Sequence, residues 1–287
     1  MKTHAVESRV TKTANAAIFV FLFILAVLTI YPIIYILLGS FKENEELVSG
    51  GLNLLPHKFI FDNYVQAWEM GNFSVYTFNS VFLSVMVTVI TLFTTSMAGY
   101  VFARKEFRFK KLIFNTMIMF MFINVGSVSL RPLFELAVKL HLNTSLWAVI
   151  LIAAGTDQTI YILLIRGFMQ TIPKELDEAA MIDGCGFFGT YFKIILPNLR
   201  PALATVGLLS FRGAWNQYIL PLVFTMSNDK LRPLTVGVLE LRNNGDGAAA
   251  WNILFAGSAL SIVPIIIVYF ISSKRFVGGM MSGSVKG

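Results

Sequence analysis

Six long apolar runs, separated by short charged stretches, are the feature of this sequence that most restricts how it can fold. A helix of about 20 mainly apolar residues crosses the ~30 Å hydrocarbon core of a bilayer. A chain in lipid must also satisfy its backbone hydrogen bonds internally. We therefore predict an all-α polytopic membrane protein with six transmembrane helices. The runs cover residues 16–38, 77–102, 112–130, 146–164, 202–224 and 253–272.

The third run contains several polar and small residues, and a broken or cavity-lining helix is expected there. Its polar and small residues are Asn124, Gly126, Ser127 and Ser129.

Composition also indicates a membrane protein. Of the 287 residues, 56% are hydrophobic and 14% are charged, whereas a soluble domain carries about 25% charged residues. The first run is too long for the apolar part of a cleavable signal peptide. The one cysteine, Cys185, excludes an internal disulfide. We expect a single transmembrane domain over residues 1–287, with tails at 1–15 and 273–287 around a core at 16–272.

Positive charge predicts the orientation of the chain. Fifteen Lys and Arg residues lie in the two tails, between the second and third runs, and around residues 166–200, against seven on the opposite side. Because cytoplasmic loops carry an excess of Lys and Arg, both termini are predicted to lie in the cytoplasm. The basic cluster at residues 104–111 is expected to anchor a loop at anionic lipid headgroups rather than to bind nucleic acid.

The first outer loop, residues 42–76, is the longest and carries several aromatic side chains. It is expected to have structure of its own. Trp and Tyr favour the membrane interface, so the loop is either an interfacial packing element or a docking surface for an extracytoplasmic protein.

A polar segment at residues 178–201 interrupts the apolar chain between the fourth and fifth runs. Thr171-Ile172-Pro173 predicts a helix start, and the carboxylates that follow suit the positive end of a helix dipole. Gly184 permits a turn that a side chain would penalise, and Pro197 is expected to end a second short helix. Such a helix–glycine–helix unit suits either a force-transmitting contact with a protein or a helix that lies on lipid. The second helix has an apolar side formed by Phe187, Phe188, Tyr191, Phe192 and Ile195.

The spacing in this segment, E-A-A, three residues, G, then I-x-L-P, resembles the coupling loop of ABC importer permeases. S-F-R-G-A-W-N-Q-Y-I-L-P-L at residues 210–222 resembles permeases of carbohydrate importers related to the maltose system, as do residues 55–64 and the ending at 283–287. The resemblance implies a second homologous permease, two cytoplasmic ATPases that bind ATP in place of this chain, and an extracytoplasmic solute-binding protein. It assigns contact with the ATPase to Glu178, Ala179, Ala180, Asp183 and Gly184.

Sugar binding uses aromatic faces with amide and hydroxyl partners, and the fifth run offers this chemistry. Its members are Trp215, Asn216, Gln217 and Tyr218. The alternative is that Trp215 and Asn216 fix helix packing between two permeases.

Charges within spans are costly and face a cavity or a partner. Asp157 is expected to pair with Arg212 or Arg131. The alternatives are that Asp157 and its neighbours contact substrate, or that the arginines favour an acidic sugar.

The sequence lacks the marks of an enzyme. It has no G-x-x-x-x-G-K-[ST] phosphate loop, and its three scattered histidines form no metal-binding pattern. We therefore predict a transport permease without cofactor or metal, surrounded by membrane lipid. Two alternatives are a permease for a non-sugar solute with the same coupling loop and an ion-driven secondary transporter, for which Asp157 is the acidic candidate.

Overall fold

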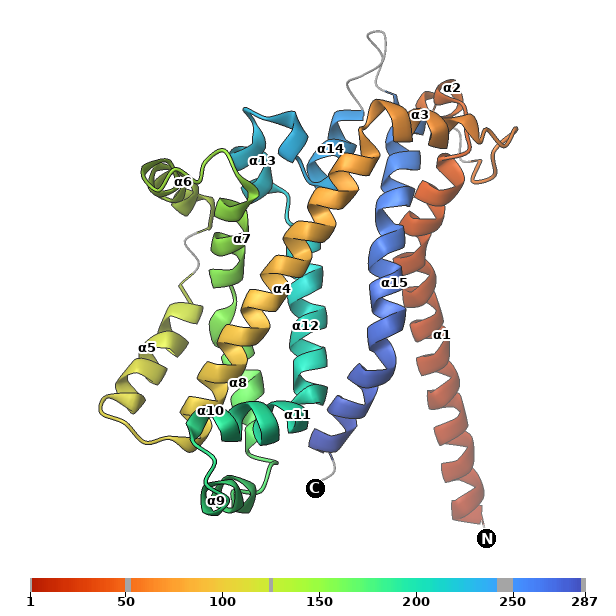
Figure 1. The fold of residues 1–287 in the computed structure, drawn as a ribbon. Helices are drawn as coiled ribbons and strands as arrows, with labels where there is room; N and C mark the ends of the chain where they lie inside the picture. The colour runs from red at the N-terminus through yellow and green to blue at the C-terminus, as the bar shows by residue number, and fades with distance from the viewer. Residues whose placement is uncertain (1, 50–52, 124–125, 242–249, 285–287) are drawn as a thin grey trace. The chain divides into compact units, whose positions relative to one another are not determined.

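The computed structural model describes residues 2–49, 53–123, 126–241 and 250–284, with side chains described from residue 15 to residue 271. All regular elements in this part of the chain are helical, which confirms the predicted all-α class (Figure 1). The chain divides into two compact units, residues 1–71 with 238–260 and residues 72–237 with 261–287. Each is described by itself. Three parts of the sequence discussed above lie outside the described residues: Asn124, residues 285–287, and Arg242, which is one of the seven basic residues counted on the opposite side.

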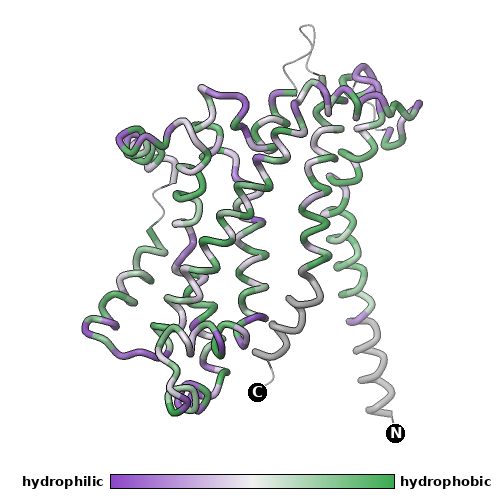
Figure 2. The backbone as a smooth tube through the Cα atoms, in the orientation of Figure 1, coloured by the Kyte–Doolittle hydropathy of each residue, from purple (hydrophilic) through white to green (hydrophobic). Residues whose placement is uncertain are grey.

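The first unit is built on α1, Lys2–Gly39, whose apolar side chains are exposed on all sides between residues 15 and 34. Figure 2 shows the apolar character of the residues along this helix by the colour of its backbone. A helix that is apolar all round suits lipid rather than water. At its end Gly39 lies under the ring of Phe255, which belongs to α15, Trp251–Ser284.

The loop after α1 is folded, as predicted, and contains α2, Asn44–Val48, and α3, Asp62–Met70. The amide nitrogen Nδ2 of buried Asn63 donates to the carbonyl oxygens of Ser40 and Lys42, both at 2.9 Å. Its oxygen Oδ1 accepts from Asn252 Nδ2 at 2.8 Å. One buried amide therefore ties the end of α1, the loop and α15 together.

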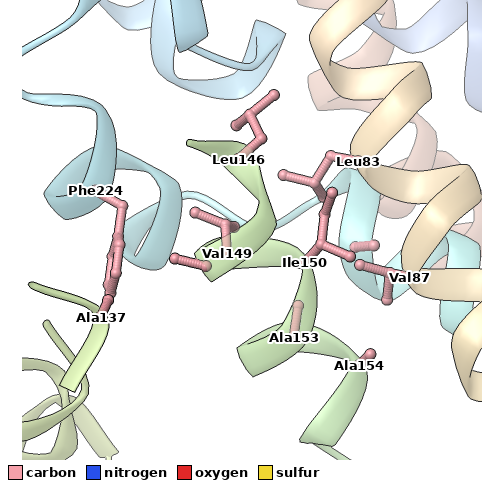
Figure 3. Close-up of a cluster of buried hydrophobic side chains, with 11 residues drawn as sticks. Leu83, Val87, Ala137, Leu146, Val149, Ile150, Ala153, Ala154 and Phe224 are labelled. Atoms are coloured by element: carbon pink, nitrogen blue, oxygen red, sulfur yellow. The ribbon is translucent and has the colours of Figure 1, made fainter. Parts of the chain in front are cut away.

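The second unit is organised around α4, Phe73–Arg104, the longest helix in it. α7, Leu146–Gly155, α8, Gln158–Met169, and α12, Arg200–Trp215, pack along α4. Figure 3 shows Leu83 and Val87 of α4 meeting Leu146 and Ile150 of α7 in one buried cluster. Phe224 of α13, Ile219–Thr225, and Ala137 of α6, Leu130–Lys139, close the cluster.

The shorter elements of this unit connect the long helices. Apart from those at residues 175–198, they are α5 at Lys110–Met121, η1 at Gly126–Ser129, η3 at Asp229–Leu231 and α14 at Leu234–Glu240, which continues into the first unit.

The predicted six crossings fit the described helices, of which three are long and apolar enough to cross singly. By length and composition, Asn15–Gly39, Phe73–Arg104 and Trp251–Ile271 can each cross a membrane. Three further crossings require bent pairs: α5 with residues 126–139 at 115°, α7 with α8 at 50°, and residues 187–198 with α12 at 78°. The predicted break in the third run is confirmed.

Two runs predicted as continuous helices are broken in the structure. The fourth is interrupted at Thr156 and Asp157, where Asp157 takes the left-handed conformation with φ 57°. The fifth stops at Trp215 and resumes at Ile219. Hydropathy did not reveal either break, because each occupies only two or three residues inside an apolar run.

Close packing of α4 on α8 depends on Gly99. A Cβ atom at this position would lie 2.4 Å from Cγ2 of buried Ile165. Gly99→Ala should therefore destabilise the protein by about 1–3 kcal/mol through overpacking, seen as a lower melting temperature in detergent. Gly167→Ala on α8 is the matched control, because no described atom lies within 4 Å of the added methyl, and alanine there favours the helix. Equal melting temperatures for the two variants would contradict this packing.

Candidate functional site

The polar segment folds as the predicted helix–glycine–helix unit. α9, Glu175–Ile182, carries Glu175, Asp177 and Glu178 in its first turn, where carboxylates stabilise the helix dipole. The helix ends in a Schellman motif, because Cys185 N donates to Ala180 O at 2.9 Å and Gly184 N to Met181 O at 3.1 Å. Gly184 has φ 78°, which glycine adopts without strain.

The second helix runs further than predicted. α10, Phe187–Thr190, continues through a π-helical turn, Tyr191–Ile195, into α11, Leu196–Asn198. Pro197 therefore lies inside the helix, and the bend toward α12 occurs after Asn198. The π turn permits this, because Leu196 N bonds back to Tyr191 O just before the proline, which has no N–H to donate.

A buried ion pair fastens α9 to the end of α4. Arg104 Nε donates to Asp177 Oδ2 at 2.9 Å, and the hydroxyl of Tyr100 donates to Asp177 Oδ1 at 2.9 Å. The guanidinium also donates to the carbonyl oxygens of Ile172 and Pro173, just before α9. The Arg104 and Asp177 side chains are 8% and 12% exposed, so the pair is largely removed from water.

This arrangement corrects the role predicted for Arg104. Arg104 pairs with a buried carboxylate instead of anchoring a loop at lipid headgroups. Asp177 was expected only to stabilise the helix dipole, as one of the carboxylates that follow Pro173. A signal was available, because Arg104 is the last residue of a long apolar helix and needs a partner there. A neighbouring pair of charges joins residues that are close in sequence. The Lys110 ammonium donates to Glu106 at 2.8 Å, which lowers the pKa of that exposed carboxyl.

Aromatic rings of α4, α10 and the π-helical turn pack together beside this ion pair. The ring of Tyr100 stacks on Phe187, with centroids 5.4 Å apart, and lies 5.8 Å from Tyr191. The hydroxyls of Tyr191 and Ser96 are 2.6 Å apart. Tyr191 and Ile195 are buried, whereas Phe188 and Phe192 are exposed, so part of the predicted apolar side faces outward.

The opposite face of α9 is open and mixed in character. Glu178, Ala179 and Asp183 are exposed there, and Ile182 is 87% exposed. Ala180 is buried at 1% exposure, so of the five residues assigned to contact it is the one that faces inward.

A second group of predicted site residues gathers at the break between α7 and α8. Asp157 lines three cavities, of about 450, 420 and 70 Å³. Arg212 and Asn216 share the 420 Å³ cavity with it, and Gln217 shares the smallest. Gln217 Oε1 is buried with no hydrogen-bond donor among the described residues.

The predicted ion pair of Asp157 is wrong for the described part of the chain. Neither Asp157 nor Arg212 forms a salt bridge there, and both are exposed to the cavity. Arg131 pairs instead with Glu135, Nε to Oε1 at 3.0 Å, four residues along α6.

Trp215 and Tyr218 do not line these cavities. Trp215 is 3% exposed and stacks on Phe211 at 5.8 Å, which agrees with a packing role. The described residues contain no group of three or more His, Cys, Asp or Glu side chains that could hold a metal ion.

The chain resembles transport proteins over nearly its whole length. The family model "Binding-protein-dependent transport system inner membrane component" matches residues 95–280. The probable ABC transporter permease protein YurM of Bacillus subtilis (strain 168) is 35% identical over 95% of this chain and 89% of its own length.

Other relatives are named for sugars or their derivatives. The arabinooligosaccharides transport system permease protein AraQ of Halalkalibacterium halodurans is 35% identical over 92% of this chain and 93% of its own. The sulfoquinovosyl glycerol permease SmoH of Agrobacterium fabrum (strain C58) is 33% identical over 92% and 91%. A crystal structure of a bacterial ABC transporter that imports the acidic polysaccharide alginate aligns with TM-score 0.79 and 25% identity, over 93% of this chain and 97% of that chain.

The turn at Gly184 offers a test of the local geometry. Gly184→Ala should cost about 1–2 kcal/mol because an L-residue is strained at positive φ, and the turn at residues 183–186 should be cleaved faster by a nonspecific protease. Gly186→Ala is the control, since Gly186 has φ −71° and neither glycine has a described atom within 4 Å of an added Cβ. Equal cleavage of the two variants would show that the turn does not require glycine.

Proposed function

Because the chain belongs to the family of binding-protein-dependent transport system inner membrane components, we propose that it is a permease subunit of a bacterial ABC importer for oligosaccharides or related carbohydrates. The names of the relatives support this substrate class. The family consists of transport permeases rather than enzymes, and it works with an ATPase and a solute-binding protein.

The observation that carries the proposal is the geometry of α9. One face of this helix is fixed to α4 through Asp177, and the other presents Glu178, Ala179, Asp183 and Ile182. A short helix that is held on one side and open on the other can receive a push and pass it to the spans. Buried Ala180 serves this contact by packing, and exposed Gly184 serves it by the turn that ends the helix.

The complex that we propose has two permeases and two ATPases. This chain and a second, homologous permease each supply half of the pathway, and each binds one cytoplasmic ATPase through its coupling helix. Both termini and residues 178–201 lie in the cytoplasm, in agreement with the distribution of Lys and Arg. Residues 1–287 act as one transmembrane domain, and the folded loop at 42–76 is available to an extracytoplasmic binding protein.

Transport proceeds by alternating access. ATP binding and hydrolysis on the partner subunits close and open the ATPase dimer, which moves α9. The spans attached to it then expose the pathway to one side of the membrane at a time. This chain transmits force from α9 to the spans, and the partner ATPase binds and hydrolyses ATP.

The cavities at Asp157 are proposed as this chain's part of the sugar pathway. A carboxylate accepts hydrogen bonds from sugar hydroxyls, whereas the Arg212 guanidinium donates them and the Asn216 and Gln217 amides do both. Asp157 and Arg212 balance in charge, which favours a neutral saccharide over an acidic one. Trp215 and Tyr218 support the segment that carries both amides.

The function is tested by uptake of labelled oligosaccharides into proteoliposomes that contain the complete complex. Uptake should require ATP and an active partner ATPase. Glu178→Lys should reduce ATPase co-purification about tenfold, equivalent to ~1.4 kcal/mol, because it reverses charge on the exposed face of α9. Glu106→Lys, the same reversal outside α9, is the control.

Two outcomes would contradict the proposal in different ways. Uptake that persists with an inactive ATPase would indicate an ion-driven transporter. ATP-dependent uptake with normal co-purification by Glu178→Lys would leave the importer intact and remove the coupling role of that face.

The pathway assignment predicts that Asp157→Asn lowers uptake about 10- to 100-fold, because hydrogen bonds to a charged group contribute ~1.5–3 kcal/mol. Basal ATPase activity and expression should be unchanged. Glu135→Gln, which alters an exposed carboxylate on α6, is the control. Full uptake with unaltered preference between neutral and uronic-acid saccharides would exclude a substrate role for Asp157.

A further inference from the structure

We propose that α4 is a rigid transmission rod between the ATPase contact and the opposite end of this unit, and that two buried polar joints make it so. One joint consists of Tyr100 and Arg104 with Asp177, and the other of Asn79 and Ser80 with residues 230–234. The inference rests on the function proposed above, and it assigns positioning roles to residues that touch neither ATP nor substrate.

The first joint fixes the coupling helix to the last turn of α4. Both oxygens of the Asp177 carboxylate are used, one by Tyr100 and one by Arg104. The same guanidinium reaches the carbonyl oxygens of Ile172 and Pro173 before α9. The two buried residues of α9 are Asp177 and Ala180, and the side chain of Ala180 is small. A push on α9 is therefore passed directly to α4 through this ion pair.

The second joint fixes an irregular segment to the other end of α4. Asn79 Nδ2 donates to Lys230 O at 2.8 Å and to Arg232 O at 3.0 Å. Ser80 Oγ accepts from Leu234 N at 2.7 Å. Both side chains are buried. The ring of Tyr76 covers Gly237, where a Cβ would lie 2.1 Å from Cδ2, so this segment follows α4 closely.

Between the joints α4 is uninterrupted. Residues 79 to 104 span about 38 Å at 1.5 Å per residue, enough to cross the hydrocarbon core. Of the three long helices, α4 is the one without an internal proline, since α1 contains Pro32 and α15 contains Pro264. The Asp157 cavities are lined mainly by the broken helices, and Val87 and Thr91 of α4 line the smallest of the three. Figure 1 shows α9 and α10 at one end of α4 and α13 toward the other.

The proposal follows from this contrast. Broken helices can change shape around a substrate, but they transmit displacement poorly. An unbroken helix that is held by buried, charged or doubly bonded groups at both ends moves as one piece. In the proposed orientation, residues 230–234 lie on the outer side, where a binding protein delivers sugar. The rod thus transmits the docking of the binding protein to the ATPase. In the other direction, it transmits the movement of the ATPase to the outer side.

The test uses the complete reconstituted complex and measures the ratio of binding-protein-stimulated to basal ATPase activity. Asp177→Asn keeps the size of the side chain and one acceptor but removes the charge that holds Arg104. It should lower this ratio about fivefold or more, the usual lower range of coupling between sites, while the complex still assembles. Glu106→Gln, which removes the same charge from an exposed pair, should leave the ratio unchanged.

The second joint supplies the decisive comparison. Asn79→Ala should lower the same ratio although it lies at the far end of the helix. Because both changes interrupt one path, the double variant should be no worse than the more severe single variant. Losses that multiply in the double variant would show two independent contributions and would overturn the rod.

Assembly and function are separated by two further measurements. Where Asp177→Asn fails to assemble, Tyr100→Phe removes a single hydrogen bond and should lower the ratio in the same direction. An assembled Asp177→Asn or Tyr100→Phe complex with an unchanged ratio would overturn the proposal. If the unmodified complex shows no stimulation by its binding protein, the proposed function fails first.

Discussion

The constraint on which this structure depends is that backbone groups in hydrocarbon must find partners within the protein. Helices meet it by themselves, so each interruption needs a local substitute. At the break between α7 and α8, Thr156 Oγ1 donates to Ile152 O at 3.1 Å, and the Gln158 amide donates to Ala154 O. Before the bend at Leu199, Asn198 Nδ2 donates to Ile194 O at 2.7 Å. Polar side chains therefore bond to main-chain carbonyl groups where the helices break or bend.

The same constraint separates the charges into two groups. Arg104 and Asp177 satisfy each other inside the protein, together with Tyr100 and two carbonyl groups. Glu178, Asp157 and Arg212 form no ion pair among the described residues and face open space. Breaking a buried pair leaves an uncompensated charge, which costs about 3–5 kcal/mol, so the first group holds the structure together. The second group is free to meet groups outside the chain, and in the proposed function these are a partner at α9 and a solute at the cavities.

The sequence predicted what depends on local pattern and missed what depends on distant contacts. Apolar run length located the helices, and Gly184 located the turn, because each is decided within a few neighbouring residues. The partnership of Arg104 with Asp177 joins positions 73 residues apart, and no periodicity records it. The breaks at Asp157 and after Trp215 escaped prediction because two or three polar residues hardly change the hydropathy of a run of about 20. Pairing Asp157 with Arg212 by charge alone was wrong, since both line one cavity without forming a salt bridge.

The broken helices and the unbroken α4 have different tasks in this unit. A transporter must deform around its solute and still carry force across about 30 Å of hydrocarbon, and one helix cannot do both well. Here the deformable positions, Asp157 and the segment after Trp215, lie beside the cavities, whereas α4 passes them without a break and is bonded at each end. Gly99 and the small side chains of α7 let the broken helices lie close against this rod. The rod therefore supplies the fixed reference against which the broken helices can bend.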